Sequence, residues 1–574
     1  MIIQFTIGNF LSFKEQSTLS LVASALKEIQ VPAEDIIFNV GTSGLSLMKS
    51  AVVYGANASG KSNFIKALEF FKWYVINSSK DIQAGERVNI ESFRLNSLTA
   101  NEPSYFEAIF CDEDNQYRYG FEADNSLVHS EWLYQKALLD KMDILPVQYF
   151  YEPDDKDEEE CRLELSNLYV PAQVYVDALF GVGLSRKVSG VYRAAIEEWN
   201  EHKKECDAYG VAVDICSGLD AKSGQVLGAC VKADVQITFG YGKVGQFLYP
   251  GASLSDKTIV CDIGMPNEAV YHIDGLPFNC LEKSDAKDWL GSRCLWGNKG
   301  TFGRVVIIAG SSGMAGAAYL SALAAYRTGA GLVDIVTPEC NRLVLQQLLP
   351  EAVLHCISEI PKDEDEEQLS YLQKEVLPKA KAIVIGPGLS TDTLAKKLLD
   401  MVLEWNKSQN CPIVIDADAL NLLAMRTNID QAEYLGENVI LTPHPGELGR
   451  LMNSSAKEAA KNLLSFAEEL QKKFGCICVC KDARTVILTQ KNRYLNLTGN
   501  SGMATGGSGD VLTGVIASLA AQGLSAERAA VLGVWLHGAA GDEAAKEKSP
   551  YSMIARDLAD GLSKVLIQTS RKKV

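Results

Sequence analysis

The clearest periodic signal lies in residues 288–574, where short apolar runs alternate with segments of helical length. The runs read RVVIIAG, AIVIGPG, PIVIDAD, NVILTPH and TVILTQ. Continuous β-branched runs indicate strands buried on both faces, and their alternation with helices is typical of parallel βαβ units. Most of these runs end in Gly, Asp or His, and a doubly wound sheet binds its ligands at that end of its strands. We therefore predict an α/β domain with a doubly wound sheet and a ligand site at the strand ends.

The same pattern recurs over a shorter length in residues 141–287. Its runs are VYVDALFG, VAVDICSG, VQITFG and TIVCDIG, and they predict a partial Rossmann-like domain. An acidic stretch, EPDDKDEEE, lies between Ile144 and Leu165 and marks a boundary. Because 574 residues exceed what one core can hold, we expect three segments, 1–140, 141–287 and 288–574.

Composition is that of an ordinary globular protein, with 47% hydrophobic and 22% charged residues. The formal net charge of -17 disfavours nucleic acid and anionic membranes as partners, because repulsion would oppose both. No stretch approaches about 18 uninterrupted apolar residues, and the start of the chain does not resemble a signal peptide. The 14 cysteines include no CxxC pair, which favours reduced thiols over a zinc site. We expect a cytoplasmic protein.

A phosphate-binding motif lies near the N-terminus. Residues 55–62 read GANASGKS and fit GxxxxGK[ST] in full, between the strand pattern AVVY and the helix pattern NFIKALEFF. In this setting backbone N–H groups cradle phosphates. The predicted P-loop includes Gly55 and Gly60. Lys61 would reach the β- and γ-phosphates of a nucleotide, and Ser62 would bind Mg2+.

A second glycine-rich segment, TGNSGMATGGSGDVLTG, spans Thr498–Gly514 and leads into the helix pattern VLTGVIASLAAQGL. Successive N–H groups of such a loop can turn toward a phosphate at the helix N-terminus, where the helix dipole favours negative charge. Asp510 would then accept the proton of a hydroxyl group as a phosphoryl group arrives. A glycine-rich turn can also be a plain loop, so this segment alone is weak evidence.

The indication from the glycine-rich segment becomes strong because it is one of five motifs that occur together and in order. They are KGTFGRVVIIAGSSGMAGAAYLSALAAYRTGAGLV, IGPGL, PIVIDADALNLL, LTPHPGEL and GMATGGSGD. Over residues 298–565 the chain thereby resembles the NAD(P)H-hydrate dehydratases, which have a ribokinase-like fold. The resemblance implies that ATP or ADP, accompanied by Mg2+, phosphorylates the hydroxyl group of the (6S)-hydrate of NADH or NADPH. Loss of phosphate then restores the intact coenzyme.

The resemblance also implies roles for individual residues. Asp510 would be the catalytic base and would contact the hydrate, while Ala317, Gly388 and His444 would line the hydrate pocket. The nucleotide would be held by the glycine-rich loop and by KDART, which departs from the family's KGxxT at its second and fourth positions. The implied nucleotide-binding residues are Lys481, Asp482, Ala483, Arg484, Thr485, Asn500, Ser501, Gly502, Met503, Ala504, Thr505, Gly506, Gly507, Ser508 and Gly509.

Structural alternatives stay open for several of these positions. Ala317 and Gly388 could simply allow close packing of a helix and a strand. His444 lies between two prolines in TPHPGE and could be a satisfied structural histidine. His537, within VLGVWLHGAAGD, is expected to pack in the core. The two aspartates of IDADALN could orient a bound metal or cap the next helix.

The middle segment resembles the NAD(P)H-hydrate epimerase domain, through VYVDALFGVGLSRKVSG, VAVDICSGLDAKSGQ and FGYGKVGQFLYPGA. The resemblance implies that Asp177 and Ser217 bind K+ and that Asp214 binds the hydrate and handles its proton. It also implies a phosphate-binding loop formed by Gly181, Val182, Gly183, Leu184, Ser185, Arg186 and Lys187. Alternatively, the strand-end aspartates could cap the turns that follow them.

One departure from the epimerase family is large. The family's N-terminal half, with its GNNGGDG phosphate-binding loop, has no counterpart, and recognisable similarity is expected to begin only near Val147–Tyr151. A domain that lacks its first strands loses both core burial and substrate contacts. We therefore expect epimerase activity to be vestigial or absent.

Residues 1–140 resemble the start of AAA-type ATPases of the ABC-like, abortive-infection kind, through the opening IxxFxxxNFxSFKE and YGANASGKSN. Such ATPases need a Walker B strand that ends in Asp-Glu, and the only candidate, VQYFYEPDD at 147–155, is a poor match. We expect an α/β P-loop fragment that binds nucleotide without efficient hydrolysis.

Three functions follow from these observations. The first is nicotinamide nucleotide repair, with hydrated NADH or NADPH and an adenine nucleotide as small-molecule partners, in a homo-oligomer without nucleic-acid or membrane partners. The second is a ribokinase-like kinase for a vitamin precursor, which would release a stable phosphorylated product. The third is a P-loop ATPase switch protein, in which nucleotide binding at Lys61 would control another protein.

Overall fold

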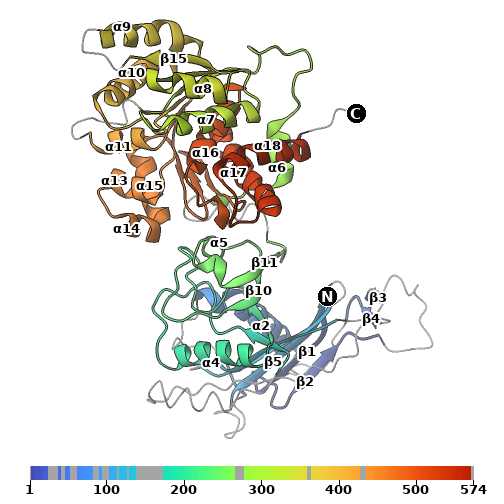
Figure 1. Ribbon diagram of the computed structural model, residues 1–574. Coiled ribbons are helices and arrows are strands. Elements are labelled where there is room, and N and C mark those ends of the chain that lie inside the picture. The colour runs from blue at the N-terminus through green and yellow to red at the C-terminus, as the bar shows by residue number, and fades with distance from the viewer. Residues whose placement is uncertain are drawn as a thin grey trace. The chain divides into compact units, whose positions relative to one another are not determined.

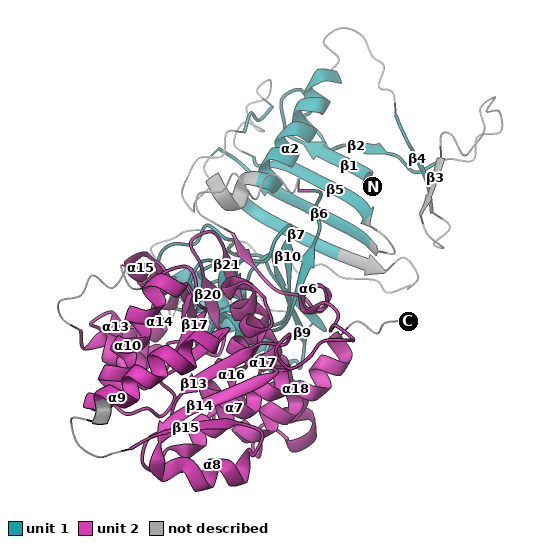
Figure 2. Cartoon of the chain, turned by 90° about the horizontal axis from the view of Figure 1, so that it is seen from above, with its two compact units in different colours: residues 1–264 teal, residues 265–574 magenta. Residues whose placement is uncertain are grey.

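The computed structural model describes residues 2–23, 37–40, 45–51, 61–81, 90–93, 102–112, 115–125, 128–137, 172–265, 277–358, 364–426 and 435–570. Contacts divide the chain into two compact units, Met1–Gly264 and Met265–Val574, which Figure 2 colours separately. Each unit has its own sheets and hydrophobic cores. In the described residues no helix is long and apolar enough to cross a membrane.

The first part of unit 1 is an antiparallel sheet with the strand order β2-β1-β5-β6-β7 (Figure 1). Helix α2 (Lys61–Asp81) packs on it through aromatic rings, because large apolar rings bury much surface. Tyr74 stacks on Phe121, with 3.9 Å between the ring centroids. The strands are β1 (Ile2–Gly8), β2 (Ser17–Ser20), β5 (Ser104–Asp112), β6 (Asn115–Ala123) and β7 (Val128–Ala137), with a separate hairpin of β3 (Ile37–Val40) and β4 (Leu45–Met48).

The helix expected after the P-loop is present, since Lys61 and Ser62 are the first residues of α2. Gly55 and Gly60 lie outside the described residues, as does the segment Val147–Tyr151. The nucleotide site at the P-loop therefore stays a prediction.

The second part of unit 1 is a four-stranded parallel sheet with the order β11-β10-β9-β8. Its strands coincide with the four apolar runs of the middle segment, so the expected βαβ pattern is confirmed. They are β8 (Val174–Asp177), β9 (Tyr209–Val213), β10 (Ala233–Phe239) and β11 (Ser255–Cys261), accompanied by α4 (Val191–Glu205), α5 (Val244–Phe247) and the 3-10 turn η2 (Gly251–Ser253).

The two faces of this sheet differ in burial. Helix α4 covers one face, where Tyr175 meets Trp199 with 6.3 Å between the ring centroids. On the other face Val174 and Tyr209 are paired neighbours, and each is 51% exposed. Parallel sheets are normally covered on both faces. Exposed apolar side chains on this second face of the sheet are consistent with a partial domain that lacks the elements that would cover it.

Unit 2 contains a ten-stranded sheet with the order β12-β21-β20-β19-β18-β17-β16-β13-β14-β15. The strands are β12 (Phe278–Asn279), β13 (Arg304–Ile308), β14 (Leu332–Pro338), β15 (Val353–Ile357), β16 (Ala382–Ile385), β17 (Ile413–Ile415), β18 (Val439–Leu441), β19 (Ile477–Cys480), β20 (Val486–Leu488) and β21 (Arg493–Leu495). The run from β15 to β19 is parallel, and β20 is antiparallel to both of its neighbours. All five apolar runs of residues 288–574 contribute strands to it.

Helices cover both faces of this sheet (Figure 1). Four helices form one layer with the core residues Val305 and Ile307; they are α7 (Ala315–Thr328), α16 (Ser508–Ala521), α17 (Ala526–Lys548) and α18 (Ala555–Thr569). Val306 and Ile308 alternate with these residues and are equally buried on the opposite face. The remaining helices are α6 (Lys283–Leu290), α8 (Arg342–Leu348), α9 (Glu364–Tyr371), α10 (Thr393–Gln409), α11 (Asp418–Ala424), α13 (Pro445–Leu451), α14 (Ala456–Lys461) and α15 (Leu463–Phe474), with short turns η4 (Glu339–Asn341), η5 (Leu372–Val376), η6 (Leu377–Lys379) and η7 (Ser501–Met503).

The strand order reverses between β13 and β16. From β13 the chain adds β14 and β15 toward one edge of the sheet. It then returns to form β16 on the other side of β13, and β17, β18 and β19 follow toward the opposite edge. The N–H of Gly310, after β13, donates to the carbonyl of Pro387, after β16, at 2.9 Å. A reversal of this kind opens a crevice at the carboxyl ends of the strands. This reversal lies at the strand ends where the sequence predicts a ligand site.

Candidate active site

The glycine-rich loop ends at the N-terminus of α16. Gly507 caps the helix with φ of 89°, a left-handed conformation that favours glycine, and Asp510 lies in the first helical turn. The first N–H groups of a helix have no partner within the helix and attract anions. A Cβ atom at Gly506 would meet no atom within 4 Å, so the loop is open on that side. This geometry suits a phosphate.

Two side chains from α17, one an acceptor and one a donor, hold the loop and its helix in place. The carboxylate of Asp542 accepts the N–H of Gly499 and the side-chain amide of Asn500, both at 3.0 Å. Buried His537 donates from Nε2 to the carbonyl of Ser508 at 2.9 Å. Burial lowers the pKa of His537 to about 4, so this ring is neutral. The expectation that His537 packs in the core is confirmed, and its hydrogen bond gives it a further role in fixing the loop.

A buried ion pair lies beneath the loop. Nζ of Lys481, directly after β19, is 2.6 Å from Oδ1 of Asp416, directly after β17. A Cβ atom at Gly509 would lie 3.3 Å from this Nζ and 3.5 Å from Oδ2 of Asp416. Burial disfavours the Lys481 ammonium, yet the carboxylates of Asp416, Glu447 and Asp510 outweigh burial and raise the pKa of Lys481.

Asp510 has the properties of a general base. Burial raises the pKa of Asp510 to about 7, the nearby Asp416 carboxylate adds to the rise, and Lys481 opposes it. A general base is most effective when its pKa lies near the working pH. A carboxyl group at this position with a pKa near neutrality is suited to proton transfer, and its role as the base stays a prediction.

His444 follows β18 and is the N-cap of α13. The ring atom Nδ1 of His444 accepts the backbone N–H of Gly446 at 3.0 Å. The backbone N–H of His444 donates to Oε2 of Glu447 at 2.8 Å. Burial, together with Lys481 and Arg450, lowers the pKa of His444. Burial also raises the pKa of Glu447 to about 7. Glu447 is not among the residues predicted from the sequence, although a Glu three residues after an N-cap is a capping signal.

Ala317 and Gly388 flank the strand-order reversal, one on α7 after β13 and the other after β16. Gly388 has φ of 56°, and a Cβ atom there would lie 2.9 Å from Cβ of Ala317. The two positions therefore do pack closely, as the structural alternative required. Their contact with a ligand stays a prediction.

The KDART segment lies next to the glycine-rich loop in the fold. The segment Lys481–Thr485 joins β19 to β20, and Arg484 donates to the carbonyl of Leu497 at 2.8 Å. Leu497 leads directly into the glycine-rich loop at Thr498. The fold thus brings the KDART segment and the loop together, although about a dozen residues of chain lie between them.

The two aspartates of IDADALN have separate partners. Asp416 pairs with Lys481, and Oδ2 of Asp418 accepts the N–H of Ser390 at 2.8 Å. The side chain of Asp418 makes no cap on α11. Within the described ranges no group of three or more His, Cys, Asp or Glu side chains could hold a metal ion.

In unit 1, Asp177 and Ser217 form a buried pair at the end of β8. The Asp177 carboxylate accepts the hydroxyl and the N–H of Ser217, at 2.6 and 2.7 Å. Burial raises the pKa of Asp177 to about 6, although the two hydrogen bonds from Ser217 lower it. No basic side chain among the described residues pairs with this carboxylate at ion-pair distance. Hard oxygen donors that lack a positive partner fit an alkali cation.

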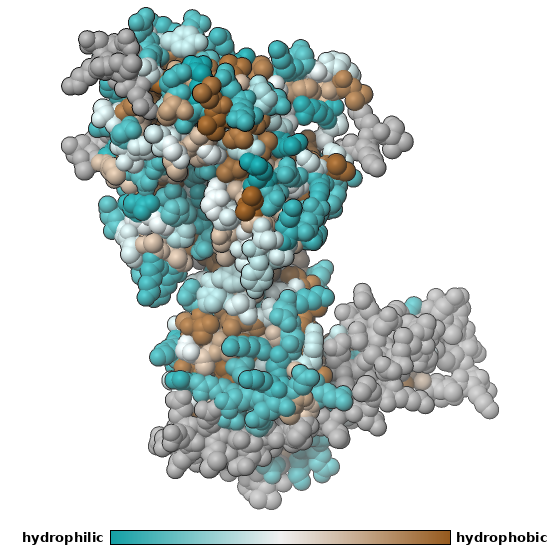
Figure 3. Space-filling model, in the orientation of Figure 1, coloured by the Kyte–Doolittle hydropathy of each residue, from teal (hydrophilic) through white to brown (hydrophobic). Residues whose placement is uncertain are grey.

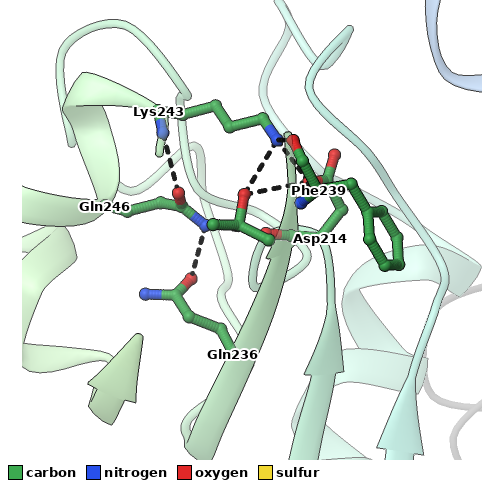
Figure 4. A network of polar contacts seen from close by, with 6 residues as sticks. Asp214, Gln236, Phe239, Lys243 and Gln246 are labelled. Atoms are coloured by element: carbon green, nitrogen blue, oxygen red, sulfur yellow. Dashed lines mark hydrogen bonds and ion pairs between the residues drawn. The ribbon is translucent and has the colours of Figure 1, made fainter. Parts of the chain in front are cut away.

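Figure 4 shows a polar network around Asp214, which has φ of 65°. Its carboxylate accepts the ammonium of Lys243, the hydroxyl of Thr238 at 3.0 Å and the N–H of Phe239 at 3.1 Å. The backbone carbonyl of Asp214 accepts the side-chain amide of Gln246 at 2.7 Å. Asp214 is thus held by the last two residues of β10 and by side chains that follow it, and Lys243 is a partner that was not predicted from the sequence. The loop 181–187 follows β8 and exposes Arg186 and Lys187.

Three protein families match parts of the chain. The family described as NAD(P)H-hydrate dehydratase matches residues 305–564, and the family described as YjeF-related protein N-terminus matches residues 118–245. An AAA-domain family of the AbiEii toxin, Type IV TA system kind matches residues 50–159.

The second match begins earlier than the start near Val147 that the motifs predicted, so that expectation is corrected. In the structure, residues 118–123 lie in β6 and residues 128–137 in β7, and these strands pair in the antiparallel sheet and not with β8. The overlap of two family matches over 118–159 leaves the expected boundary at 140 a prediction. The boundary at 287 also stays a prediction; helix α6 packs with unit 2, where Ala286 is fully buried.

Several relatives are similar over most of the chain. The bifunctional NAD(P)H-hydrate repair enzyme Nnr of Moorella thermoacetica is 39% identical over 408 residues, which cover 71% of this chain and 74% of that enzyme. The enzyme of the same name from Escherichia coli is 35% identical, with 71% and 74% covered. The one from Coxiella burnetii is 36% identical, with 68% and 75% covered.

Solved structures match about half of the chain. An ADP/ATP-dependent NAD(P)H-hydrate dehydratase from Bacillus subtilis, co-crystallized with ATP/Mg2+, is 31% identical, with a TM-score of 0.44. A ribokinase-like superfamily protein from Enterococcus faecalis is 30% identical, with a TM-score of 0.46. Each match covers 52% of this chain and 100% of the solved chain.

Proposed function

Because the chain belongs to the family of bifunctional NAD(P)H-hydrate repair enzymes, we propose that Asp510 is the base of its dehydratase reaction. The chain acts in nicotinamide nucleotide repair, and its C-terminal unit is an ADP/ATP-dependent NAD(P)H-hydrate dehydratase. The observation that carries the proposal for Asp510 is its position: a partly buried carboxyl group with a pKa of about 7, in the first turn of the helix that follows the glycine-rich loop.

In the proposed reaction, Asp510 removes the proton of the hydroxyl group on the hydrated ring. The hydroxyl oxygen then attacks the terminal phosphoryl group of ATP or ADP. N–H groups at the N-terminus of α16 stabilise the transferring phosphoryl group, and the residues from Asn500 to Gly509 hold the nucleotide phosphates. Mg2+ bound to the nucleotide neutralises part of the phosphate charge.

Phosphate then leaves together with the hydroxyl oxygen, and the adjacent ring carbon loses a proton. This elimination restores the double bond of NADH or NADPH. The nucleoside diphosphate or monophosphate is the other product. In this scheme Ala317, Gly388 and His444 line the hydrate pocket, and the contact between Ala317 and Gly388 sets its width.

The test is to incubate the purified chain with the S-hydrate of NADH and either ATP or ADP, and to follow regeneration of NADH by its near-ultraviolet absorbance. We expect Asp510→Asn to lower kcat by about a hundredfold to ten-thousandfold, as loss of a general base does. The control variant is Asp560→Asn, because this carboxylate is exposed and makes only a surface ion pair with Arg327. An active Asp510→Asn variant would reject Asp510 as the base.

The same assay separates the alternative functions. Accumulation of a stable phosphorylated alcohol without NADH would identify a vitamin-precursor kinase. A P-loop switch protein would lose its function in Lys61→Ala and keep it in Asp510→Asn.

For unit 1 we propose a vestigial epimerase site. Asp177 and Ser217 would bind K+, the loop 181–187 would contact the hydrate's phosphates, and Asp214 would contact the hydrate. The buried, unbalanced carboxylate of Asp177 supports the cation site. With the R-hydrate of NADH as substrate, we expect the full chain to give NADH no faster than spontaneous epimerisation allows. A rate that rises with added KCl would instead show a working epimerase.

The remaining assignments are proposals of the same kind. We propose three functional segments, 1–140, 141–287 and 288–574, of which the first would bind a nucleotide through its P-loop. We propose that the protein is cytoplasmic and forms a homo-oligomer. Size-exclusion chromatography with light scattering tests the last point directly.

A further inference from the structure

The glycine-rich loop lies against one face of helix α17. A Cβ atom at Gly538 would lie 2.2 Å from the hydroxyl oxygen of Thr498, and one at Gly541 would lie 2.3 Å from the sulfur of Met503. Positions 538 and 541 are three residues apart, so they share a face of the helix. Because neither position carries a side chain, the start of the loop, residues 498–503, approaches the helix backbone closely.

The same helix presents a carboxylate that accepts two hydrogen bonds from the loop. One oxygen of Asp542 accepts the backbone N–H of Gly499, and the other accepts the side-chain amide of Asn500, each at 3.0 Å. Two helical turns earlier, the carbonyl of Trp535 accepts the hydroxyl of Thr498 at 3.0 Å. The start of the loop is therefore tied to α17 at two levels.

The amide of Asn500 is oriented from both of its ends. Its nitrogen donates to Asp542, and its oxygen accepts the N–H of Gly502 at 3.0 Å. Since the oxygen is held by Gly502, the nitrogen faces position 542, where only an acceptor can pair with it. A carboxylate at this position has one oxygen for Gly499 and one for Asn500. An amide there would have a single oxygen for the two donors.

The far end of the loop is held by the same helix, because His537 donates to the carbonyl of Ser508 at 2.9 Å. Between the two anchors lie residues 501–507, which belong to the segment proposed to hold the nucleotide phosphates. A loop that is held in place before its ligand arrives loses less conformational freedom when the ligand binds. The contacts with α17 should therefore contribute to the affinity for the nucleotide.

From these contacts we propose that Asp542 is a positioning residue of the dehydratase reaction. It holds the start of the glycine-rich loop in the conformation that receives the phosphates of ATP or ADP, and it acts through Gly499 and Asn500 without touching the nucleotide. The inference rests on the proposed function and deepens it, because it adds a residue outside the loop to the nucleotide side of the site. Its effect falls on nucleotide binding and not on proton transfer by Asp510.

The test measures binding of ATP with Mg2+ to the full chain by isothermal titration calorimetry, without hydrate, alongside steady-state kinetics. Asp542→Ala should raise the Kd and the KM for ATP about tenfold, as loss of hydrogen bonds to a charged acceptor does. Its kcat and its KM for the hydrate at saturating ATP should stay within about twofold of the wild type. The matched control is Glu543→Ala, which removes a carboxylate from the next position of α17, where it pairs with Lys546 and not with the loop. This control should bind ATP as the wild type does.

A conservative variant tests the route through Asn500. Asp542→Asn can pair with Gly499 or with Asn500 but not with both, so its Kd for ATP should lie between those of the wild type and Asp542→Ala. In an Asn500→Ala background, Asp542→Asn should have little further effect, because the contact that it removes is already absent. Additive losses would contradict this route. Circular dichroism reports folding, and Asp542→Asn carries the test if Asp542→Ala does not fold.

The outcomes separate this inference from the proposed function. Asp542→Ala with a lower Tm but an unchanged affinity for ATP would overturn the inference, because the contact would then be only structural. An equal rise in the KM for ATP and the KM for the hydrate would also overturn it. A wild-type chain that does not dehydrate the S-hydrate would defeat the proposed function, whereas weaker binding of ATP by Asp542→Ala would still support the positioning role.

Discussion

At the scale of single residues, the site depends on charges that are withdrawn from water. Three carboxyl groups, those of Asp416, Glu447 and Asp510, influence one buried ammonium, that of Lys481. Burial raises the pKa of Glu447 and of Asp510, so each of these two carboxyl groups is protonated in part of the molecules near neutral pH. The pKa of each is about 7.

The first prediction concerns the rate of dehydration as a function of pH. Only the ionised Asp510 can accept a proton, so kcat/KM should rise as pH increases through about 7 and then level off. The measurement is kcat/KM for the S-hydrate in buffers of constant ionic strength. A rate that is flat across this range, or that falls with rising pH, would contradict the assignment of the base.

The second prediction concerns stability. The pKa of Asp510 is raised by folding from 3.8 to about 7, so the folded protein holds this proton more tightly than the unfolded chain. The stability that the proton provides is complete below the unfolded pKa and is lost as pH rises through the folded pKa. Asp510→Asn stays neutral, and its free energy of unfolding should exceed that of the wild type by on the order of 1–3 kcal/mol above about pH 7.

Thermal unfolding at several pH values checks this expectation. The difference in Tm between Asp510→Asn and the wild type should grow between about pH 4 and pH 7 and stay constant above it. A constant difference at every pH would mean that the carboxyl group is not buried at a cost in the folded protein.

Single residues differ in how far the sequence could identify them. Asp510 and Lys481 stand in motifs, next to glycines and strand ends, and are found by local pattern. Asp542, His537 and Lys243 stand in ordinary helical or loop sequence, and each gains its role from a contact with a residue more than 25 positions away. No local signal announces such a contact, because chain folding alone brings the partners together.

At the scale of elements, the glycine-rich loop and α16 act together. Gly507 needs its left-handed conformation to turn the chain into the helix, whereas Gly506 faces open space. The two adjacent glycines can therefore be compared directly. The backbone conformation of Gly507 favours glycine, whereas a Cβ atom at Gly506 would meet no other atom.

The third prediction uses this pair. Gly507→Ala should lower the free energy of unfolding by roughly 1–3 kcal/mol, because φ of 89° strains an alanine and its Cβ atom would lie 2.5 Å from Cδ1 of Leu320. Gly506→Ala should leave the free energy of unfolding nearly unchanged. Urea unfolding of the two variants measures both. Equal losses would mean that the turn does not depend on the conformation of Gly507.

The elements themselves were predictable to different degrees. Continuous runs such as VVII and IVI form strands because every side chain in them is buried, and the periodicity of the sequence shows this directly. The position of β16 beside β13 could not be predicted, because strand neighbours are chosen by packing across the whole sheet. The antiparallel return of β20 beside β19 was likewise not foreseen, since TVILTQ has the same composition as the parallel strands.

At the scale of the whole molecule, the described residues form two units with separate cores. On the face of the molecule that Figure 3 shows, apolar patches over unit 2 are small and lie among hydrophilic side chains. The complete dehydratase signature lies within unit 2, and so do all the residues proposed for that reaction. The dehydratase reaction as proposed therefore uses no residue from unit 1.

The fourth prediction follows from this separation. A chain of residues 265–574 should fold cooperatively and dehydrate the S-hydrate with kcat/KM within about threefold of the full chain, because its sheet and site are complete. Steady-state kinetics of the two proteins at equal concentration make the comparison. If the shorter protein unfolds or loses activity, unit 1 contributes to the dehydratase in a way that the structure does not account for.

The central claim is that a phosphoryl group is transferred to the hydroxyl group of the hydrate at the N-terminus of α16 before that group leaves. The most direct measurement uses S-hydrate that carries oxygen-18 in its hydroxyl group, with unlabelled ATP, and analyses the products by mass spectrometry. Transfer through a phosphorylated intermediate predicts that the heavy oxygen appears in inorganic phosphate, in step with NADH. Recovery of the heavy oxygen in water would contradict it.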